Sequence, residues 1–349
     1  MAEKTALAIH GGAGTILRSQ MTPALEDEYR GGLESALKAG WEILEKGGSS
    51  LDAVEAAVVS LEDFPLFNAG RGSVFTHEGK NEMDAAIMDG ANLKAGAVAF
   101  VRNIKNPIKL ARLVMKSTEH VLLAGDGANQ FASEMGIEHA PDEYFFTEHR
   151  WLQLQDAIAS GRVQLDHVDT LANEVSVSTR SREGGLASAP ESATQSGRRP
   201  PLATATNHLE LNKSKGTVGA VACDAKGRLA AATSTGGMTN KKFGRVGDTA
   251  IIGAGTYADE TCAVSCTGHG EYFQRAVTAY DLAARMKYKG LSLEAASNET
   301  IDHLTAIGGE GGLIAVDIHG NIVLPFNSEG MYRAMISADA DPLIEIYHR

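Results

Sequence analysis

Thr217 stands where a long polar segment gives way to an apolar strand. Residues 169–215 are rich in Ser, Gly, Pro and Arg, with scarcely any aromatic or β-branched core former, a composition typical of disordered linkers. A long insert of this kind inside a compact domain favours a functional or processed segment, and exposed segments are where chains are cut. A cut between Gly216 and Thr217 would make Thr217 an N-terminal residue.

The turn after this strand places a second threonine opposite Thr217. The three residues that end at Gly227 fit a hairpin loop with a left-handed glycine, so Asp224 pairs with Arg228. Counting back in antiparallel register places Thr235 opposite Thr217, on the same face of the sheet. An ordinary cross-strand pair of β-forming residues is the alternative, but the upstream linker favours two hydroxyls that meet at a cleavable chain end.

Arg245 and Asp248 flank Gly247 in a region rich in glycine. A guanidinium binds a carboxylate and a carboxylate binds an ammonium, so the pair describes an amino-acid recognition site. Glycine lets a backbone approach a ligand and present its N–H groups. Taken alone, Arg-x-x-Asp is more often a surface ion pair, and the Thr-Gly-x-Gly at 267–270 is more often a turn than an oxyanion hole.

Composition restricts the class of protein. The chain has 349 residues, 43% hydrophobic and 22% charged, with a formal net charge of -12, which predicts a globular protein and disfavours a nucleic-acid binder. The basic residues of the linker are interpreted as a solvated tail rather than a binding patch. Cys223, Cys262 and Cys266 are an odd count, which favours buried thiols in a reducing compartment. Because we find no signal peptide and no apolar run of membrane length, we expect a cytoplasmic protein without a membrane partner.

Neither the histidines nor the first glycine cluster indicates other chemistry. The eleven histidines show no His-Glu-x-x-His spacing and the cysteines no Cys-x-x-Cys spacing, so a catalytic transition metal is not expected. Residues 10–14, His-Gly-Gly-Ala-Gly, are similar to the oxyanion loops of esterases, but the chain has no Gly-x-Ser-x-Gly elbow. We interpret these residues as a turn at a strand end.

The spacing of apolar residues predicts an α/β fold. Ser49 and Asp52 give a capping-box-like start to the second helix, and Asn106 with Pro107 caps and opens the third. The strand after Thr217 is apolar or small on both faces, which implies a layered architecture. Expected strands are 6–10, 84–88, 95–100, 217–224, 228–235, 313–317 and 321–326, and expected helices are 24–45, 51–61, 107–116, 271–288 and 293–306.

Taken together, these residues resemble the plant-type (type III) L-asparaginases, or isoaspartyl peptidases, of the N-terminal nucleophile (Ntn) hydrolases. The resemblance covers nearly the whole chain outside the linker. Its ordered blocks are specific as a set, although each is weak alone. They are 9–14 (IHGGAG), 65–70 (PLFNAG), 83–85 (MDA), 94–99 (KAGAVA), 216–222 (GTVGAVA), 232–241 (ATSTGGMTNK), 244–248 (GRVGD), 265–270 (SCTGHG) and 325–327 (PFN).

The resemblance implies that the precursor cleaves itself before Thr217. Thr217 would become the nucleophile, and its new α-amino group, with a pKa of about 7.7 to 8.0, the general base. Gly216 suits a strained peptide unit because it has no Cβ. Thr235 would orient the nucleophile, and Thr267 with the Gly268 N–H would form the oxyanion hole.

The resemblance also implies the substrate contacts and the reaction. Arg245 would clamp the α-carboxylate and Asp248 the ammonium. The chain would hydrolyse isoaspartyl (β-aspartyl) dipeptides and L-asparagine to L-aspartate through an ester on Thr217. The preference between these substrates stays open, because both present the same aspartyl group. The implied binding set is Asn68, Arg245, Val246, Gly247, Asp248, Thr267, Gly268, His269 and Gly270.

The implied fold is a four-layer αββα sandwich, the Ntn-hydrolase fold, built by both fragments as one domain. An α subunit would span 1–216, of which 168–216 is a dispensable disordered tail, and a β subunit 217–349. Two processed heterodimers would form an (αβ)2 dimer, and no cofactor is required. A structural sodium ion is implied at a loop, with an ordinary loop closed by Pro65 and Gly70 as the equal alternative. Its ligands would be the backbone carbonyls of Leu61, Glu62, Phe64, Phe67, Ala69 and Arg71.

Three other functions stay open. Glycosylasparaginases typically carry Asp before the threonine, where this chain has Gly216. A taspase-type endopeptidase is expected to have a longer insert and different flanks. A non-catalytic small-molecule binding protein would keep Thr217 internal to an intact chain.

Overall fold

The computed structural model describes residues 5–161, 163 and 216–348, and this part of the chain has the predicted mixed α/β fold. The predicted linker up to residue 215 lies outside the described residues. The chain before and after that segment packs into one compact unit. Among the described residues, no helix has the length and apolar character needed to cross a membrane.

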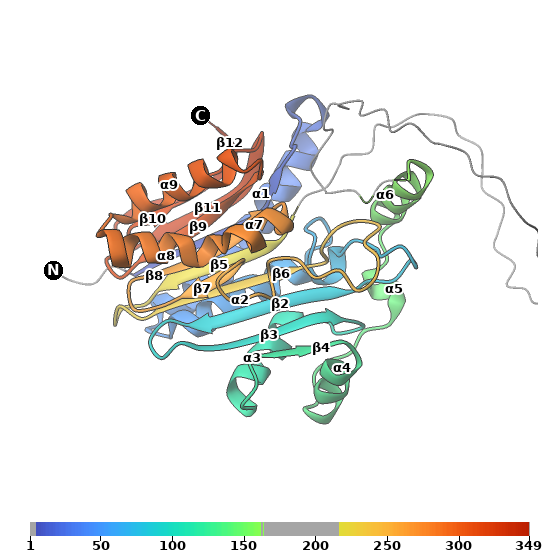
Figure 1. Ribbon diagram of the computed structural model, residues 1–349, viewed down its shortest axis with the longest axis horizontal. Helices are drawn as coiled ribbons and strands as arrows, with labels where there is room; N and C mark the ends of the chain where they lie inside the picture. Colours follow the sequence, from blue (N-terminus) through green and yellow to red (C-terminus); the bar gives the residue numbers. More distant parts are fainter. Residues whose placement is uncertain (1–4, 162, 164–215, 349) are drawn as a thin grey trace, which may run out of the picture. The chain divides into compact units, whose positions relative to one another are not determined.

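Two β-sheets organise the fold (Figure 1). The larger has eight strands, in the order β12 (Ala340–Tyr347), β11 (Gly330–Ser337), β1 (Ala6–Gly14), β5 (Val218–Cys223), β6 (Leu229–Thr235), β2 (Met83–Asp89), β3 (Lys94–Val101) and β4 (Leu122–Ala124). The smaller has four, in the order β10 (Ile322–Val323), β9 (Gly311–Asp317), β8 (Cys262–Gly268) and β7 (Thr256–Ala258). The strand that follows Thr217 is therefore central in the larger sheet.

Helices pack against both sheets. They are α1 (Pro23–Glu45), α2 (Ser50–Asp63), α3 (Pro107–Ser117), α4 (Gly125–Glu134), α5 (Asp142–Phe145), α6 (Glu148–Ala159), α7 (Gly270–Ala276), α8 (Thr278–Lys289) and α9 (Leu293–Ala306), with 3-10 helices at Arg18–Gln20 and Gly70–Gly72. The first three contact the larger sheet, whereas α8 and α9 contact the smaller one. The two sheets contact each other through β1, β5 and β6 on one side and β8 and β9 on the other.

The strand β5 contributes side chains to two separate cores. Val218, Ala220 and Ala222 belong to the apolar cluster that includes α1 and α2. Val221 and Cys223 belong to the cluster shared with the smaller sheet. The strand is buried on both faces, as the sequence predicted, and its burial stabilises the position of Thr217 at its start.

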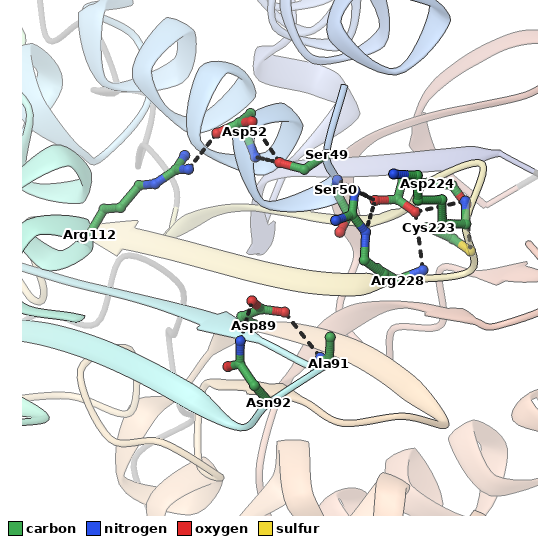
Figure 2. A network of polar contacts seen from close by, with 11 residues as sticks. Ser49, Ser50, Asp52, Asp89, Ala91, Asn92, Arg112, Cys223, Asp224 and Arg228 are labelled. Carbon is green, nitrogen blue, oxygen red and sulfur yellow. Dashed lines mark hydrogen bonds and ion pairs between the residues drawn. The ribbon is translucent and has the colours of Figure 1, made fainter. Parts of the chain in front are cut away.

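The β5–β6 hairpin has the predicted register. Val218 lies opposite Ser234, which brings Thr235 opposite Thr217. At the turn, the buried Asp224 accepts from the Arg228 side chain and from the first amide of α2 (Figure 2). The turn is thereby tied to a helix, which fixes the register at the other end of the hairpin.

The capping of α2 is also as predicted, whereas that of α3 is not. Ser49 Oγ accepts from the Asp52 amide over 3.1 Å (Figure 2). The side chain of Asn106 makes no capping bond, because it donates to a carboxylate of α2. Glu62 Oε1 instead accepts from the Ile108 amide over 3.0 Å. A carboxyl oxygen of the neighbouring helix α2 has replaced the local cap. Burial raises the pKa of Glu62 to about 8, so this group is largely neutral at pH 7.

Two further local predictions were wrong. The residues at 10–14 are not a turn, because β1 continues through them with one irregularity and pairs with β11. The helix expected at 271–288 is broken at Val277, which is left-handed with a φ of 49°. The amides of Ala279 and Tyr280 donate to backbone carbonyls at 253–254 instead of continuing the helix.

Candidate active site

Thr217 and Thr235 meet at the open end of the hairpin. Thr217 Oγ1 lies 3.1 Å from Thr235 Oγ1, which also accepts from the Gly237 amide over 3.0 Å. Both threonines are buried and line a small pocket. The pocket's other lining residues are Gly216, Gly237, Met238, Arg245, Gly247, Asp248, Gly268 and Gly270.

Gly216 occupies a position that only glycine fits. Its φ is 52°, in the left-handed region. A Cβ there would lie 2.8 Å from Thr267 Oγ1 and 2.9 Å from Gly12 Cα. Gly216 therefore packs directly against Thr267, which is expected to contribute to the oxyanion hole, and against strand β1.

His10 holds the carbonyl of Thr217, a role that the sequence analysis missed. Its Nδ1 donates to Thr217 O over 2.9 Å, so its Nε2 accepts from Ser265 Oγ at 2.8 Å. Burial lowers the pKa of His10 to about 3 despite the hydrogen bond to Thr217, so the ring is neutral. A Cβ on Gly219, opposite His10, would lie 2.0 Å from Ser265 Oγ. In the sequence, Gly219 is the signal that could have indicated the buried contact between His10 and Ser265, because only glycine leaves room for it.

Asp248 is a buried carboxylate with an open acceptor. Among the described residues, its Oδ2 has no hydrogen-bond partner. Burial raises the pKa of Asp248 to about 7, although the charge of Arg245 lowers it. A Cβ on Gly270 would lie 2.8 Å from Arg245 Nη2 and 2.9 Å from Asp248 Oδ1, so glycine there leaves room for both groups. An ammonium group would satisfy the open acceptor.

Arg245 already binds a carboxylate. Its Nε and Nη2 each donate to Glu271 over 2.9 Å, in the bidentate geometry of a guanidinium and a carboxylate. Glu271 lies in the first turn of α7, and its side chain is 44% exposed. A substrate carboxylate would have to share or replace Glu271.

Thr267 and Gly268 end strand β8 next to Gly216. Thr267 Oγ1 accepts from the Ala13 amide over 3.2 Å, which leaves its own proton available to donate. Gly268 has a φ of 148°, and a Cβ there would lie 2.4 Å from Glu310 O. The strand end thus presents a hydroxyl and a glycine backbone beside the pocket.

Four residues of the predicted binding set are not among the pocket's lining residues: Asn68, Val246, Thr267 and His269. Asn68 Nδ2 donates to Gly237 O over 2.8 Å, so Asn68 supports the pocket wall from behind. The carbonyl of Val246 accepts from a side chain of α7. His269 Nε2 lies 3.5 Å from Glu271 Oε2.

The loop expected to hold sodium is folded tightly. A Cβ on Gly70 would lie 2.4 Å from Glu62 O, and one on Gly72 would lie 2.0 Å from Phe67 O. A side chain at either position would therefore collide with a backbone carbonyl of this loop. No group of three or more His, Cys, Asp or Glu side chains in the described ranges is placed to hold a metal ion.

Comparison with known proteins identifies the family of the chain. Residues 3–346 match the family described as asparaginase. The isoaspartyl peptidase of Salmonella typhimurium is 47% identical over 346 residues, 99% of each chain. That of Escherichia coli is 47% identical over 346 residues, 99% of this chain and 96% of its own. The isoaspartyl peptidase/L-asparaginase of Xenopus laevis is 41% identical over 347 residues, 99% of this chain and 96% of its own. The chain therefore belongs to the asparaginase family, together with these isoaspartyl peptidases.

Proposed function

We propose that this protein hydrolyses isoaspartyl dipeptides and L-asparagine with Thr217 as its nucleophile. The observation that carries the proposal is the pair of threonine hydroxyls in a pocket that also contains Arg245 and Asp248. These groups complement the side-chain carbonyl, α-carboxylate and α-ammonium of an aspartyl substrate. All three relatives are named as isoaspartyl peptidases, and the Xenopus laevis protein is also named as an L-asparaginase, which supports these substrates.

The reaction begins at the side-chain carbonyl of the substrate. Thr217 Oγ attacks the carbonyl carbon while its proton passes to the α-amino group of the same residue. Thr267 and the Gly268 N–H stabilise the oxyanion. The leaving amine or ammonia departs with that proton, and water then attacks the aspartyl ester to release L-aspartate and restore the threonine. Thr235 keeps the nucleophile oriented.

We infer that the chain matures by its own cleavage between Gly216 and Thr217. The left-handed Gly216 supports this step, because the absence of a Cβ lets the peptide unit before Thr217 lie close to Thr267, the predicted oxyanion donor. The products would be an α subunit, 1–216, and a β subunit, 217–349. Strands and helices of both would build the four-layer αββα sandwich.

We further propose a sodium ion at the carbonyls of Leu61, Glu62, Phe64, Phe67, Ala69 and Arg71, and an (αβ)2 assembly. The ion would fix the loop that carries Asn68 and so support the pocket wall. Melting temperatures in sodium and choline chloride test the ion, and light scattering tests the assembly.

Substrate hydrolysis tests the proposed function directly. Processed protein is incubated with β-aspartyl-leucine, α-aspartyl-leucine, L-asparagine and N-acetylglucosaminyl-asparagine, and released L-aspartate or the sugar product is measured. We expect release from β-aspartyl-leucine and L-asparagine and none from the α-linked isomer, with Thr217→Ala as the inactive control. Activity confined to the glycosylated substrate, or binding without turnover, would contradict the proposal.

A further inference from the structure

We propose that Lys241 is a positioning residue for the substrate carboxylate, acting from behind the pocket wall. Its ammonium group would add to the field of Arg245 without touching the substrate. This inference rests on the proposed function, because it concerns how the same site binds an aspartyl group.

Lys241 lies directly behind Gly237, which lines the pocket. The lysine is buried, and its Nζ donates to Glu82 O over 2.7 Å. A Cβ on Gly237 would lie 3.1 Å from Lys241 Nζ and 3.5 Å from Arg245 Nη1. Two cationic groups thus face the same point of the pocket wall, one from the interior and one from the pocket side.

Asp84 is the buried counter-charge of this lysine. Asp84 lies opposite Thr235 in the sheet, and its Oδ1 accepts from the Phe100 amide over 2.7 Å. In the described part of the chain, its Oδ2 has no hydrogen-bond partner. Burial lowers the pKa of Lys241, while the negative charges of Asp84 and Glu82 raise it. The carboxylate therefore helps to keep the ammonium charged.

A buried ammonium at position 241 is unfavourable for folding, because it loses its hydration, whereas an apolar side chain would not. Burying a charge without full compensation is unfavourable, and replacing a buried ion pair with apolar residues of similar volume is often neutral or stabilising. A purely structural explanation is that Lys241 ties the pocket loop to the Glu82 carbonyl. The two explanations make different predictions. If the charge of Lys241 matters, its loss should weaken binding of a substrate with an α-carboxylate more than binding of a neutral analogue, whereas a purely structural role should affect both equally.

The test compares two substrates and three variants. The substrates are β-aspartyl-leucine and the same dipeptide with its aspartyl α-carboxylate converted to a carboxamide. Lys241→Met removes the charge and the hydrogen bond, Lys241→Gln removes the charge but can still donate to Glu82 O, and Lys241→Arg keeps the charge. Mature fraction and melting temperature report folding, and the Gln variant carries the test if the Met variant does not mature.

We expect both neutral variants to raise KM for the carboxylate substrate about tenfold. The attraction between the Lys241 ammonium and the substrate carboxylate in a partly desolvated site corresponds to a change in affinity of about that size. Their kcat and their KM for the carboxamide should stay within about twofold of wild type, and Lys241→Arg should stay close to wild type. Equal losses on both substrates, or wild-type behaviour of Lys241→Gln, would overturn the inference. If wild type hydrolyses neither substrate, the proposed function itself fails, which is a separate result.

Discussion

We predict that substrate binding depends on pH through Asp248. Burial raises its pKa to about 7, so the carboxyl becomes protonated as pH falls below 7 and can no longer pair with an ammonium. We expect the inhibition constant of L-aspartate to rise up to about tenfold for each pH unit below 7, as one proton competes with the ligand. Product inhibition is the better measurement, because binding needs no general base.

Asp248→Asn is the control for this dependence. Its inhibition constant should be high and flat over the same range, because the amide does not titrate. A flat profile in the wild type would show that Asp248 does not hold the ammonium.

Arg245 and Thr267 should separate binding from chemistry. Arg245→Lys loses the planar fork and should weaken substrate binding by about 2 to 4 kcal/mol, yet self-cleavage should survive, because Gly216 presents no α-carboxylate. Thr267→Ala should lower turnover about a hundredfold or more with less effect on affinity, because an oxyanion donor acts in the transition state. Steady-state kinetics on processed protein decides between these roles. An opposite pattern, with KM unchanged in the first variant and turnover unchanged in the second, would mean the assigned roles are wrong.

The β5–β6 turn, which lies at the opposite end of the hairpin from the pocket, should contribute to the stability of the fold through Asp224. Burial alone would raise the pKa of Asp224, but bonds from Arg228 and backbone amides outweigh it and lower the pKa. The carboxylate therefore stabilises the fold at neutral pH and loses this effect as pH falls through the lowered pKa. Asp224→Ala should reduce the free energy of unfolding by about 2 to 3 kcal/mol, measured by urea denaturation at pH 7.

Asp89→Ala is the matched control for this prediction. Asp89 closes a neighbouring turn through the Ala91 amide and the Asn92 side chain, at a partly exposed site with no bond to α2 (Figure 2). We expect it to cost about 1 kcal/mol. Equal effects of the two substitutions would show that the anchor to α2 contributes nothing.

Spacing along the sequence could predict this hairpin because its geometry is local. The position of Gly227 and the two-residue period of a strand suffice to bring Thr235 opposite Thr217. The break at Val277 could not be predicted in this way, because the competing carbonyls come from a loop more than twenty residues earlier. The same holds for Asn106, whose capping role passes to a carboxyl oxygen of Glu62 in another helix.

The candidate site likewise contains residues that local motifs identify and contacts that depend on distant segments of the chain. Motifs identify Thr217, Arg245 and Asp248, since their chemistry and order are visible in the sequence. The contacts of His10 and Lys241 join segments far apart in the chain, with Thr217 O and Glu82 O as their partners. Both residues lie within blocks of the family resemblance, 9–14 and 232–241, but the local pattern does not show which distant atoms they contact.

The parts of the chain before and after residues 169–215 should be sufficient for catalysis once the protein has been processed. We predict that residues 169–215 are dispensable for catalysis after maturation, because their composition lacks the apolar content to pack. Limited proteolysis of processed protein, followed by assay on β-aspartyl-leucine, should leave kcat/KM unchanged. Loss of activity on removal of this segment alone would show that it covers the site.

The central claim is that Thr217 becomes the first residue of a separate chain. The direct measurement is the intact mass of the purified protein together with N-terminal sequencing of the smaller fragment. We predict two fragments, 1–216 and 217–349, the second beginning Thr-Val-Gly-Ala, and a single uncut inactive chain for Thr217→Ala. An active wild-type protein that remains one intact chain, or a fragment that begins at any other residue, would contradict the account.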